Sequence, residues 1–253
     1  MLTGQADFNV AVDAINKGYI FRFLVKPCLP EVFLESLNEA INKNRQYQEQ
    51  VDELKKEWSL ELIRKTAEDT IKLIESLLEK RDPYTAGHQS RVAELAVAIS
   101  REIGLPEEKM EGLKIASLIH DIGKAFVPAE ILNKAGKLSE IEFSLIKTHP
   151  QAGYDVIKDI DFPWPIADII LQHHERLNGS GYPYGKIGND IILEARILAV
   201  ADVIEAMSLH RPYRPPLGTE KALLEITLNK GILYDPDVAD ACLKVFEKGF
   251  SFS

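Results

Sequence analysis

Apolar residues recur at intervals of three and four through most of the chain after residue 64, which is the spacing of a buried helix face. Two such faces are Ile71, Ile74, Leu77 and Leu78, and then Val92, Leu95, Ala96 and Ile99. No run in this region alternates between polar and apolar residues, so no half-buried strand is expected. The pattern predicts an all-α domain of roughly 190 residues, within the usual size range of a domain.

Residues 31–82 contain neither glycine nor proline, so nothing there is expected to break a helix. One continuous helix of that length would extend about 75 Å at ~1.5 Å per residue. Its apolar positions are spaced by threes and fours, although Asn44, Gln48 and Lys55 interrupt them. These positions are Leu34, Leu37, Ile41, Val51, Leu54 and Trp58. We interpret the stretch as an imperfect coiled coil that forms a homodimer through residues 31–66; two or three separate helices in one globule is the alternative.

Composition narrows the class of protein. The chain has 253 residues, 45% hydrophobic and 27% charged, as in a soluble globular protein. It has no apolar run near the ~20 residues of a membrane helix, and the stretch MLTGQADFN lacks the basic start and apolar core expected of a signal peptide. Its two isolated cysteines, Cys28 and Cys242, suit a reducing cytoplasm. The net charge of −9 argues against a long nucleic acid as partner, but it allows a small phosphate ligand at a locally positive site.

Histidines are confined to the predicted helical domain. They are His88, His120, His149, His173, His174 and His210. Two carboxylates, Asp121 and Asp202, also lie in apolar stretches with helical spacing. Any one of these residues alone is better explained as a hydrogen-bonded core residue, a surface histidine or a capping carboxylate. As a set, they need polar partners in an apolar setting, and two nearby metal ions would satisfy them together. Imidazole and carboxylate ligands without cysteine suit iron, manganese, nickel or zinc.

Five motifs follow one another at a characteristic spacing: HDIGK at 120–124, KTHP at 147–150, HHERLNGSGYP at 173–183, AVAD at 199–202 and RPYR at 211–214. From about residue 70 to 247 the chain resembles the HD-GYP family, a branch of the HD superfamily of metal-dependent phosphohydrolases. The resemblance implies a bacterial phosphodiesterase that hydrolyses cyclic di-GMP to the linear dinucleotide pGpG, and sometimes on to GMP.

The same resemblance implies roles for individual residues. The metal ligands would be His88, His120, Asp121, His149, His173, His174 and Asp202. Asp121 would bridge two ions, and Lys124 would contact the scissile phosphate. The substrate-binding positions would be Asp82, Gly181, Tyr182, Pro183, Arg211 and Arg214. The sequence alone leaves three simpler interpretations open. Lys124 could be a solvated charge at a helix end, Tyr182 could be a packed loop residue, and the two arginines could belong to an exposed basic loop. Members with three metals carry glutamate where this chain has Tyr84, so two ions are expected and His174 is the least certain ligand.

The first 45 residues resemble the C-terminal half of a two-component receiver domain. The stretch ADFNVAVDAINKG predicts a helix and YIFRFLV a buried strand. Thr3, Phe21 and Lys26-Pro27 match the switch hydroxyl, the switch aromatic and the lysine–proline pair of that family. The phospho-accepting aspartate would lie upstream, so we expect either a fragment of a longer protein or a truncated gene.

These expectations give a domain plan and a function. We expect residues 1–45 to be a small α/β receiver remnant, 46–66 a helical coiled-coil linker and 67–250 the HD-GYP domain. The expected fold of that domain is the all-α fold of the HD superfamily, preceded by a long coiled-coil-like helix. The expected activity is that of a cytoplasmic cyclic di-GMP phosphodiesterase in two-component signalling. The alternatives are a non-catalytic dinucleotide-binding module that acts through a signalling partner, and a phosphohydrolase of another nucleotide, such as a cyclic GMP–AMP dinucleotide.

Overall fold

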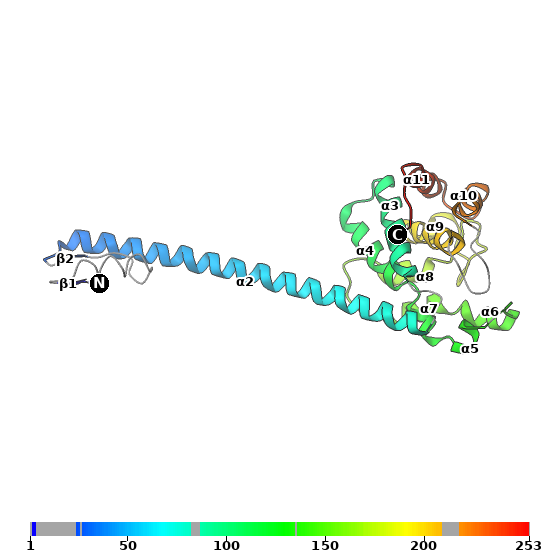
Figure 1. The fold of residues 1–253 in the computed structure, drawn as a ribbon, viewed down its shortest axis with the longest axis horizontal. Coiled ribbons are helices and arrows are strands. Elements are labelled where there is room, and N and C mark those ends of the chain that lie inside the picture. The colour runs from blue at the N-terminus through cyan, green and yellow to red at the C-terminus, as the bar shows by residue number, and fades with distance from the viewer. Residues whose placement is uncertain are drawn as a thin grey trace. The chain divides into compact units, whose positions relative to one another are not determined.

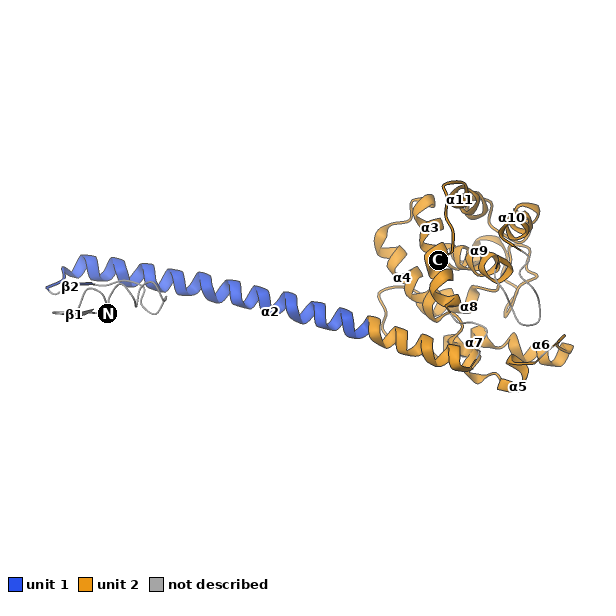
Figure 2. Cartoon of the chain, viewed as in Figure 1, with its two compact units in different colours: residues 1–67 blue, residues 68–253 orange. Residues whose placement is uncertain are grey.

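The computed structural model describes residues 2–3, 24–25, 27–81, 87–134, 136–208 and 218–252. The chain divides into two compact units, residues 1–67 and residues 68–253 (Figure 2). In the described part of the first unit, Leu2–Thr3 (β1) and Leu24–Val25 (β2) form a parallel pair, with Leu2 opposite Leu24. In the described part of the second unit, every element is a helix, so the all-α prediction for this region is confirmed.

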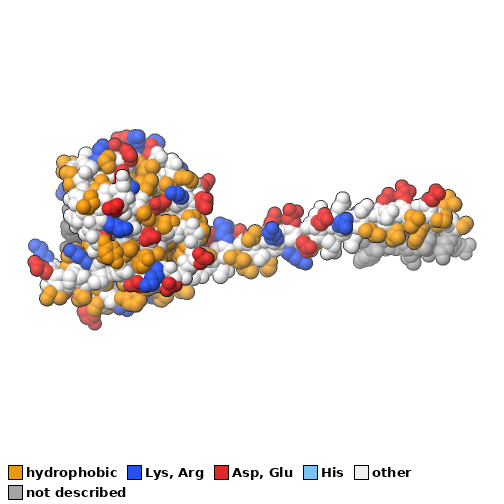
Figure 3. All heavy atoms as spheres, turned by 180° about the vertical axis from the view of Figure 1, so that it is seen from behind, with side chains coloured by type: hydrophobic (Ala, Val, Ile, Leu, Met, Phe, Trp, Pro, Cys, Tyr) orange, Lys and Arg blue, Asp and Glu red, His pale blue; other side chains and the backbone are white. Residues whose placement is uncertain are grey.

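Helix α2 runs without interruption from Pro30 to Arg81 (Figure 1). The prediction of one continuous helix is therefore confirmed, and the alternative of separate helices is wrong. Many apolar side chains of its first-unit part lie on the surface, where they alternate with charged groups (Figure 3). Trp58, for example, is 72% exposed. No helix among the described residues is both long enough and apolar enough to cross a membrane.

The second unit contains a series of shorter helices. In chain order they are α3 (His88–Ile103), α4 (Glu107–Ile119), the 3-10 helix η2 (Ile122–Phe126), α5 (Ala129–Leu132), α6 (Glu140–Ile146), α7 (His149–Ile157), α8 (Ile166–Gln172), the 3-10 helix η3 (Gly188–Asp190), α9 (Leu193–Ser208), α10 (Thr219–Leu228) and α11 (Pro236–Glu247).

The core of this unit is built around α3 and α9. Helix α3 packs against α4, α9 and α11, and α9 also packs against α8 and α10. The largest fully buried apolar side chains are Leu95, Ile99, Leu113, Ile166, Ile169, Ile170, Ile191, Ile197, Leu198, Ile204 and Ile226. Burying each such side chain contributes about 1.5–3 kcal/mol. The last turns of α2 belong to this unit, because Ile71 and Ile74 pack against the same core.

Gly123 allows η2 to lie directly against α7. A Cβ atom at this position would lie 1.9 Å from the carbonyl oxygen of His149 and 2.6 Å from the amide nitrogen of Gly153. Backbone atoms cannot move aside as a flexible side chain does, so only glycine fits here. The glycine of the HDIGK motif therefore holds the segment that carries Asp121 against the helix that begins with His149.

We predict that Gly123→Ala destabilises the second unit by about 3 kcal/mol or more, because the added methyl group overlaps backbone atoms of α7. Urea denaturation followed by circular dichroism measures this loss. Gly188→Ala is the matched control: a Cβ at Gly188 meets nothing within 4 Å, and only its positive φ of 55° is unfavourable. The control should lose about 1 kcal/mol. Equal losses in the two variants would contradict the packing role of Gly123.

Candidate metal centre

All seven residues predicted as metal ligands converge in the second unit. They form three overlapping groups in which the candidate ligand atoms lie within 4.8 Å of one another. The groups are His149–His173–His174, His88–His120–Asp202 and His120–Asp121–His173. Most of these residues lie at helix ends: His88 and His149 begin α3 and α7, while His120 and His173 directly follow α4 and α8.

Three of the imidazoles are oriented in the same way. In each, Nδ1 lies within hydrogen-bond distance of the carbonyl oxygen three residues earlier, which can only accept. These bonds join His120 to Ser117 (2.7 Å), His149 to Ile146 (2.8 Å) and His173 to Ile170 (2.6 Å). Nδ1 must therefore carry a proton, which leaves Nε2 of each ring as the candidate ligand atom. Metal-binding histidines are typically oriented by such a second hydrogen bond.

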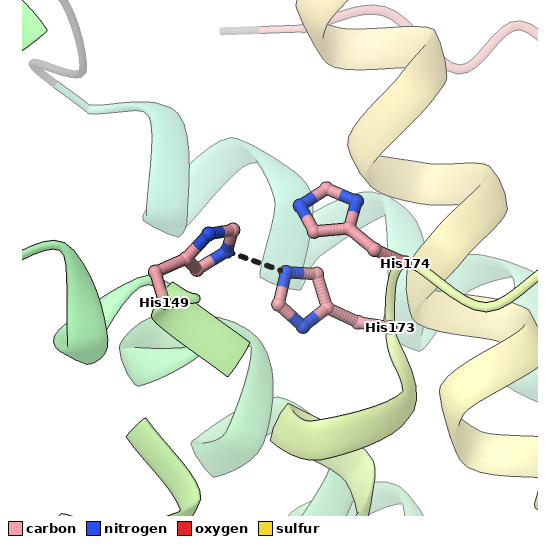
Figure 4. Close-up of side chains that lie close together, drawn as sticks. All are labelled: His149, His173 and His174. Atoms are coloured by element: carbon pink, nitrogen blue, oxygen red, sulfur yellow. Dashed lines mark hydrogen bonds between the residues drawn. The ribbon is translucent and has the colours of Figure 1, made fainter. Parts of the chain in front are cut away.

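The distance between His149 and His173 tests whether a metal fits. Their Nε2 atoms face each other 3.3 Å apart (Figure 4). Since both Nδ1 atoms donate elsewhere, neither Nε2 carries a hydrogen for the other, and two lone pairs meet in a buried site. A shared cation turns this repulsion into attraction. His174 lies beside His173, with ring centroids 4.0 Å apart, and completes this group.

Asp121 lies between the two sides of the cluster. Its Oδ1 is 3.4 Å from Nε2 of His149, while its Oδ2 is 3.6 Å from Nε2 of His120 and 3.9 Å from Nε2 of His88. One carboxylate thus presents a different oxygen to each side, which is the arrangement of a bridging ligand.

On the second side, His88 joins two carboxylates. Its Nε2 is 3.3 Å from Oδ1 of Asp202, and its Nδ1 is 2.5 Å from Oε2 of Glu205. The other oxygen of Glu205 accepts two hydrogen bonds from Arg91, at 2.9 and 2.7 Å. Sequence reasoning missed Glu205, which is 2% exposed. The available signal was its position three residues after Asp202 within residues 197–207, which are otherwise apolar; this spacing places both carboxylates on one face of the helix.

For three of the histidines and both carboxylates, the pKa shifts favour the protonation states that metal binding needs. At His88, burial would lower the pKa, but the carboxylates of Asp202 and Glu205 outweigh it and raise the pKa instead. Burial lowers the pKa of His149 to about 4 and, with the neighbouring imidazoles, holds that of His173 and His174 well below 6.5. Burial alone would raise the pKa of Asp121 and Asp202. Lys124 and the imidazoles outweigh this effect at Asp121, and His88 does so at Asp202, so both values fall well below 3.8. Near pH 7 these three histidines are neutral and the carboxylates ionised.

Lys124 lies in direct contact with the cluster. Its Nζ donates to Oδ2 of Asp121 at 2.6 Å. Asp121 precedes η2 and Lys124 lies within it, and in a 3-10 helix side chains three residues apart stack above one another. The ammonium group is thus held at the edge of the candidate metal site.

The GYP loop lies beside the histidine pair. A Cβ at Gly181 would lie 2.4–2.5 Å from backbone atoms of residues 174–176, so glycine is required for this close approach. The Tyr182 ring lies 4.7 Å from that of His174, and Pro183 follows it through a cis peptide bond. Glu175, which sequence reasoning missed, is buried and accepts backbone N–H groups of Tyr184 (2.8 Å) and Lys186 (3.0 Å). It holds the loop against the end of α8.

Some predicted residues lie outside the described ranges. They are Phe21, Lys26, Asp82, Tyr84, His210, Arg211 and Arg214. Substrate binding by Asp82, Arg211 and Arg214 stays a prediction.

Comparison with known proteins identifies the family. Residues 72–238 match the HD domain. The chain belongs to the HD domain family. It is 33% identical, over 96% of its length, to the cyclic di-GMP phosphodiesterase response regulator RpfG of Xanthomonas campestris, and spans 66% of that relative. A 3′3′-cGAMP-specific phosphodiesterase of Vibrio cholerae is 36% identical over 66% of the chain, which spans 36% of that relative. Together with the GYP motif, these relatives support the assignment of the chain to the HD-GYP branch of the family.

The fold also resembles a solved HD-domain structure. An HDG"Y"P protein from Bdellovibrio bacteriovorus superposes with a TM-score of 0.53 at 22% identity, covering 63% of this chain and 51% of that one. At this level of identity the similarity shows the HD fold alone.

We predict that Glu205→Gln weakens metal binding about 10- to 100-fold, because the amide no longer supplies the negative charge that orients and polarises His88. Competition with a chromogenic chelator measures the affinity for Mn²⁺. Glu194→Gln is the matched control, since Glu194 is also buried on α9 but pairs with Lys109. The control should bind Mn²⁺ as the unaltered protein does. A normal affinity in Glu205→Gln would remove Glu205 from the metal centre.

Proposed function

We propose that this HD-domain protein is a metal-dependent cyclic dinucleotide phosphodiesterase, and that it hydrolyses cyclic di-GMP to pGpG. The observation that carries the proposal is the cluster of five imidazoles around Asp121, whose two oxygens face two separate groups of ligand atoms. A pair of divalent metal ions about 3.5–4 Å apart is a common device for phosphodiester hydrolysis. The name of the Xanthomonas relative, a cyclic di-GMP phosphodiesterase, supports cyclic di-GMP as the substrate.

Two divalent ions, iron, manganese or nickel, would be held on either side of Asp121. His149, His173 and His174 would bind one ion. His88, His120 and Asp202 would bind the other. When bound, such ions lower the pKa of a coordinated water toward about 7 and neutralise the charge of the phosphate.

The protein's own residues orient the substrate for that chemistry. Lys124, 2.6 Å from Asp121, is placed to donate to a non-bridging phosphate oxygen once a substrate competes for its ammonium group. Gly181 and Tyr182 bring the GYP loop to the edge of the same site. Water adds to phosphorus, the bond to the 3′-oxygen breaks, and that oxygen takes up a proton, which leaves pGpG with its 5′-phosphate.

A second candidate substrate has support from a relative. The Vibrio cholerae protein is named as specific for 3′3′-cGAMP, which differs from cyclic di-GMP in one base. Either dinucleotide offers the same phosphodiester to the cluster. A comparison of turnover on both separates the two candidates.

We also propose that residues 1–45 are the remnant of a receiver domain and that α2 forms a homodimer through residues 31–66. Two observations support the assignment of a receiver remnant. β1 and β2 pair in parallel although residues 4–23 separate them in sequence, and the name of the Xanthomonas relative includes the words "response regulator". Exposed apolar side chains at the spacing of a coiled coil, among them Leu34, Leu37 and Ile41, support the dimer.

We predict that the protein loaded with Mn²⁺ or Fe²⁺ converts cyclic di-GMP to pGpG. In Asp121→Ala we expect activity to fall at least 10³-fold with loss of bound metal, because one carboxylate serves both sides of the centre. Chromatography of the products and metal analysis of the purified protein measure both effects. Binding of cyclic di-GMP without turnover by the metal-loaded protein would instead identify a binding module.

We predict that Lys124→Met lowers kcat about 10²- to 10³-fold and leaves the metal content unchanged, because it removes a donor to the developing charge but no ligand. Steady-state kinetics and metal analysis test this. Lys158→Met is the control: Lys158 also pairs with an aspartate three residues earlier, Asp155, at 2.9 Å, but in an exposed position. Its kinetics should match those of the unaltered protein. A normal kcat in Lys124→Met would refute the role of the lysine.

A further inference from the structure

A half-open groove lies beside the candidate metal centre. It has a volume of about 670 Å³, within the range of about 300–1,000 Å³ that small-molecule sites occupy. Apart from Lys124, its lining comes from the end of α5, from α6 and from described residues of the loop between them. Its apolar lining includes Ile131, Leu138, Phe143 and Ile146. None of these residues belongs to the cluster of imidazoles and carboxylates.

The groove reaches the metal centre along two sides. On one side Lys124 lines the groove and also bonds to Asp121. On the other side the Nζ atom of Lys147 lies 4.8 Å from the ring of Phe143 and 5.6 Å from that of Tyr182. Tyr182 in turn packs against His174, so the contacts from Phe143 through Lys147 and Tyr182 end at a candidate metal ligand. The groove therefore adjoins the candidate metal centre through Lys124 and through the contacts of Lys147 with Phe143 and Tyr182.

The charge of the groove differs from that of the whole chain. Three lysines, Lys124, Lys134 and Lys137, line it, with Glu140 as the acidic member, although the chain as a whole carries −9. Lys134 is held by Glu142 at 2.7 Å, in a salt bridge. Lys137 is exposed in the loop between α5 and α6. Because Glu142 neutralises Lys134, the groove offers a ligand the charge of Lys137 beside its apolar side chains. An apolar lining with a lysine at its edge suits a ligand that carries both an aromatic base and an anionic phosphate.

We infer that the α5–α6 groove binds the second nucleotide of the cyclic dinucleotide, the one whose phosphate is not cleaved. The inference rests on the proposed function. Lys137 would face the second phosphate, and the ring of Phe143 would contact a base. The groove thereby becomes a determinant of substrate class, because a diester with small substituents has nothing to place in it.

The test compares a cyclic dinucleotide with a small diester. Lys137→Glu reverses a charge in an exposed loop, so it should fold normally. For this variant we expect the ratio of kcat/KM for cyclic di-GMP to kcat/KM for bis(p-nitrophenyl) phosphate to fall at least tenfold, mainly through KM. Lys137→Arg should restore the ratio. Calorimetry with cyclic di-GMP and metal-free protein should show the same order of affinity. Lys221→Ala, at an exposed position on α10, is the control and should keep the ratio.

Each outcome decides one of the two claims. Equal losses on both substrates in Lys137→Glu, or no loss on either, would overturn the groove assignment while the proposed function stands. If the unaltered protein cleaves bis(p-nitrophenyl) phosphate but neither binds nor cleaves cyclic dinucleotides, then the proposed function fails, and the groove assignment fails with it. Phe143→Ala gives an independent check, since it removes the base contact without changing charge and should lower the same ratio.

Discussion

The geometry of the candidate metal centre depends on hydrogen bonds that fix its buried imidazoles at Nδ1. An imidazole whose Nδ1 donates to a carbonyl or carboxylate can neither rotate nor exchange its tautomer without losing that bond. In an apolar interior, an unmade hydrogen bond of this kind costs about 1–3 kcal/mol. His120, His149 and His173 are fixed by carbonyls and His88 by Glu205, so four Nε2 atoms are directed toward a common region. The convergence therefore follows from hydrogen bonds within the fold.

The same bonds also complete the helices. The last carbonyls of a helix have no partner within it. His120 and His173 directly follow α4 and α8, and each bonds to a carbonyl of the final turn of its helix. His149 bonds to Ile146, the last residue of α6. The centre is therefore built from helix ends, which explains why its ligands are far apart in sequence but rigidly placed.

The sequence predicted those features that follow from local pattern. Residues 31–82 contain neither glycine nor proline, and the structure has one helix of that length. The histidines and Asp121 were recognisable as polar residues within apolar stretches of sequence. Glu205 was missed because its role depends on His88, 117 residues away in sequence. Glu175 was missed because its partners are backbone N–H groups of a loop. The α5–α6 groove could not be foreseen, since short helices with exposed apolar residues carry no clear periodicity.

Charge explains how so acidic a chain can accept an anion. Asp121 and Asp202 bring two negative charges to the ligand set, and Lys124 brings one positive charge. Glu205 adds no net charge to the centre, because Arg91 neutralises it. Two divalent ions would therefore leave the centre clearly positive, within a protein of net charge −9. Because surface charges are screened over ~8 Å at physiological ionic strength, a phosphodiester near the centre responds to this local charge and hardly to the acidic surface. In the adjoining groove, Glu142 neutralises Lys134, so Lys137 is the lysine that would meet the second phosphate of a dinucleotide.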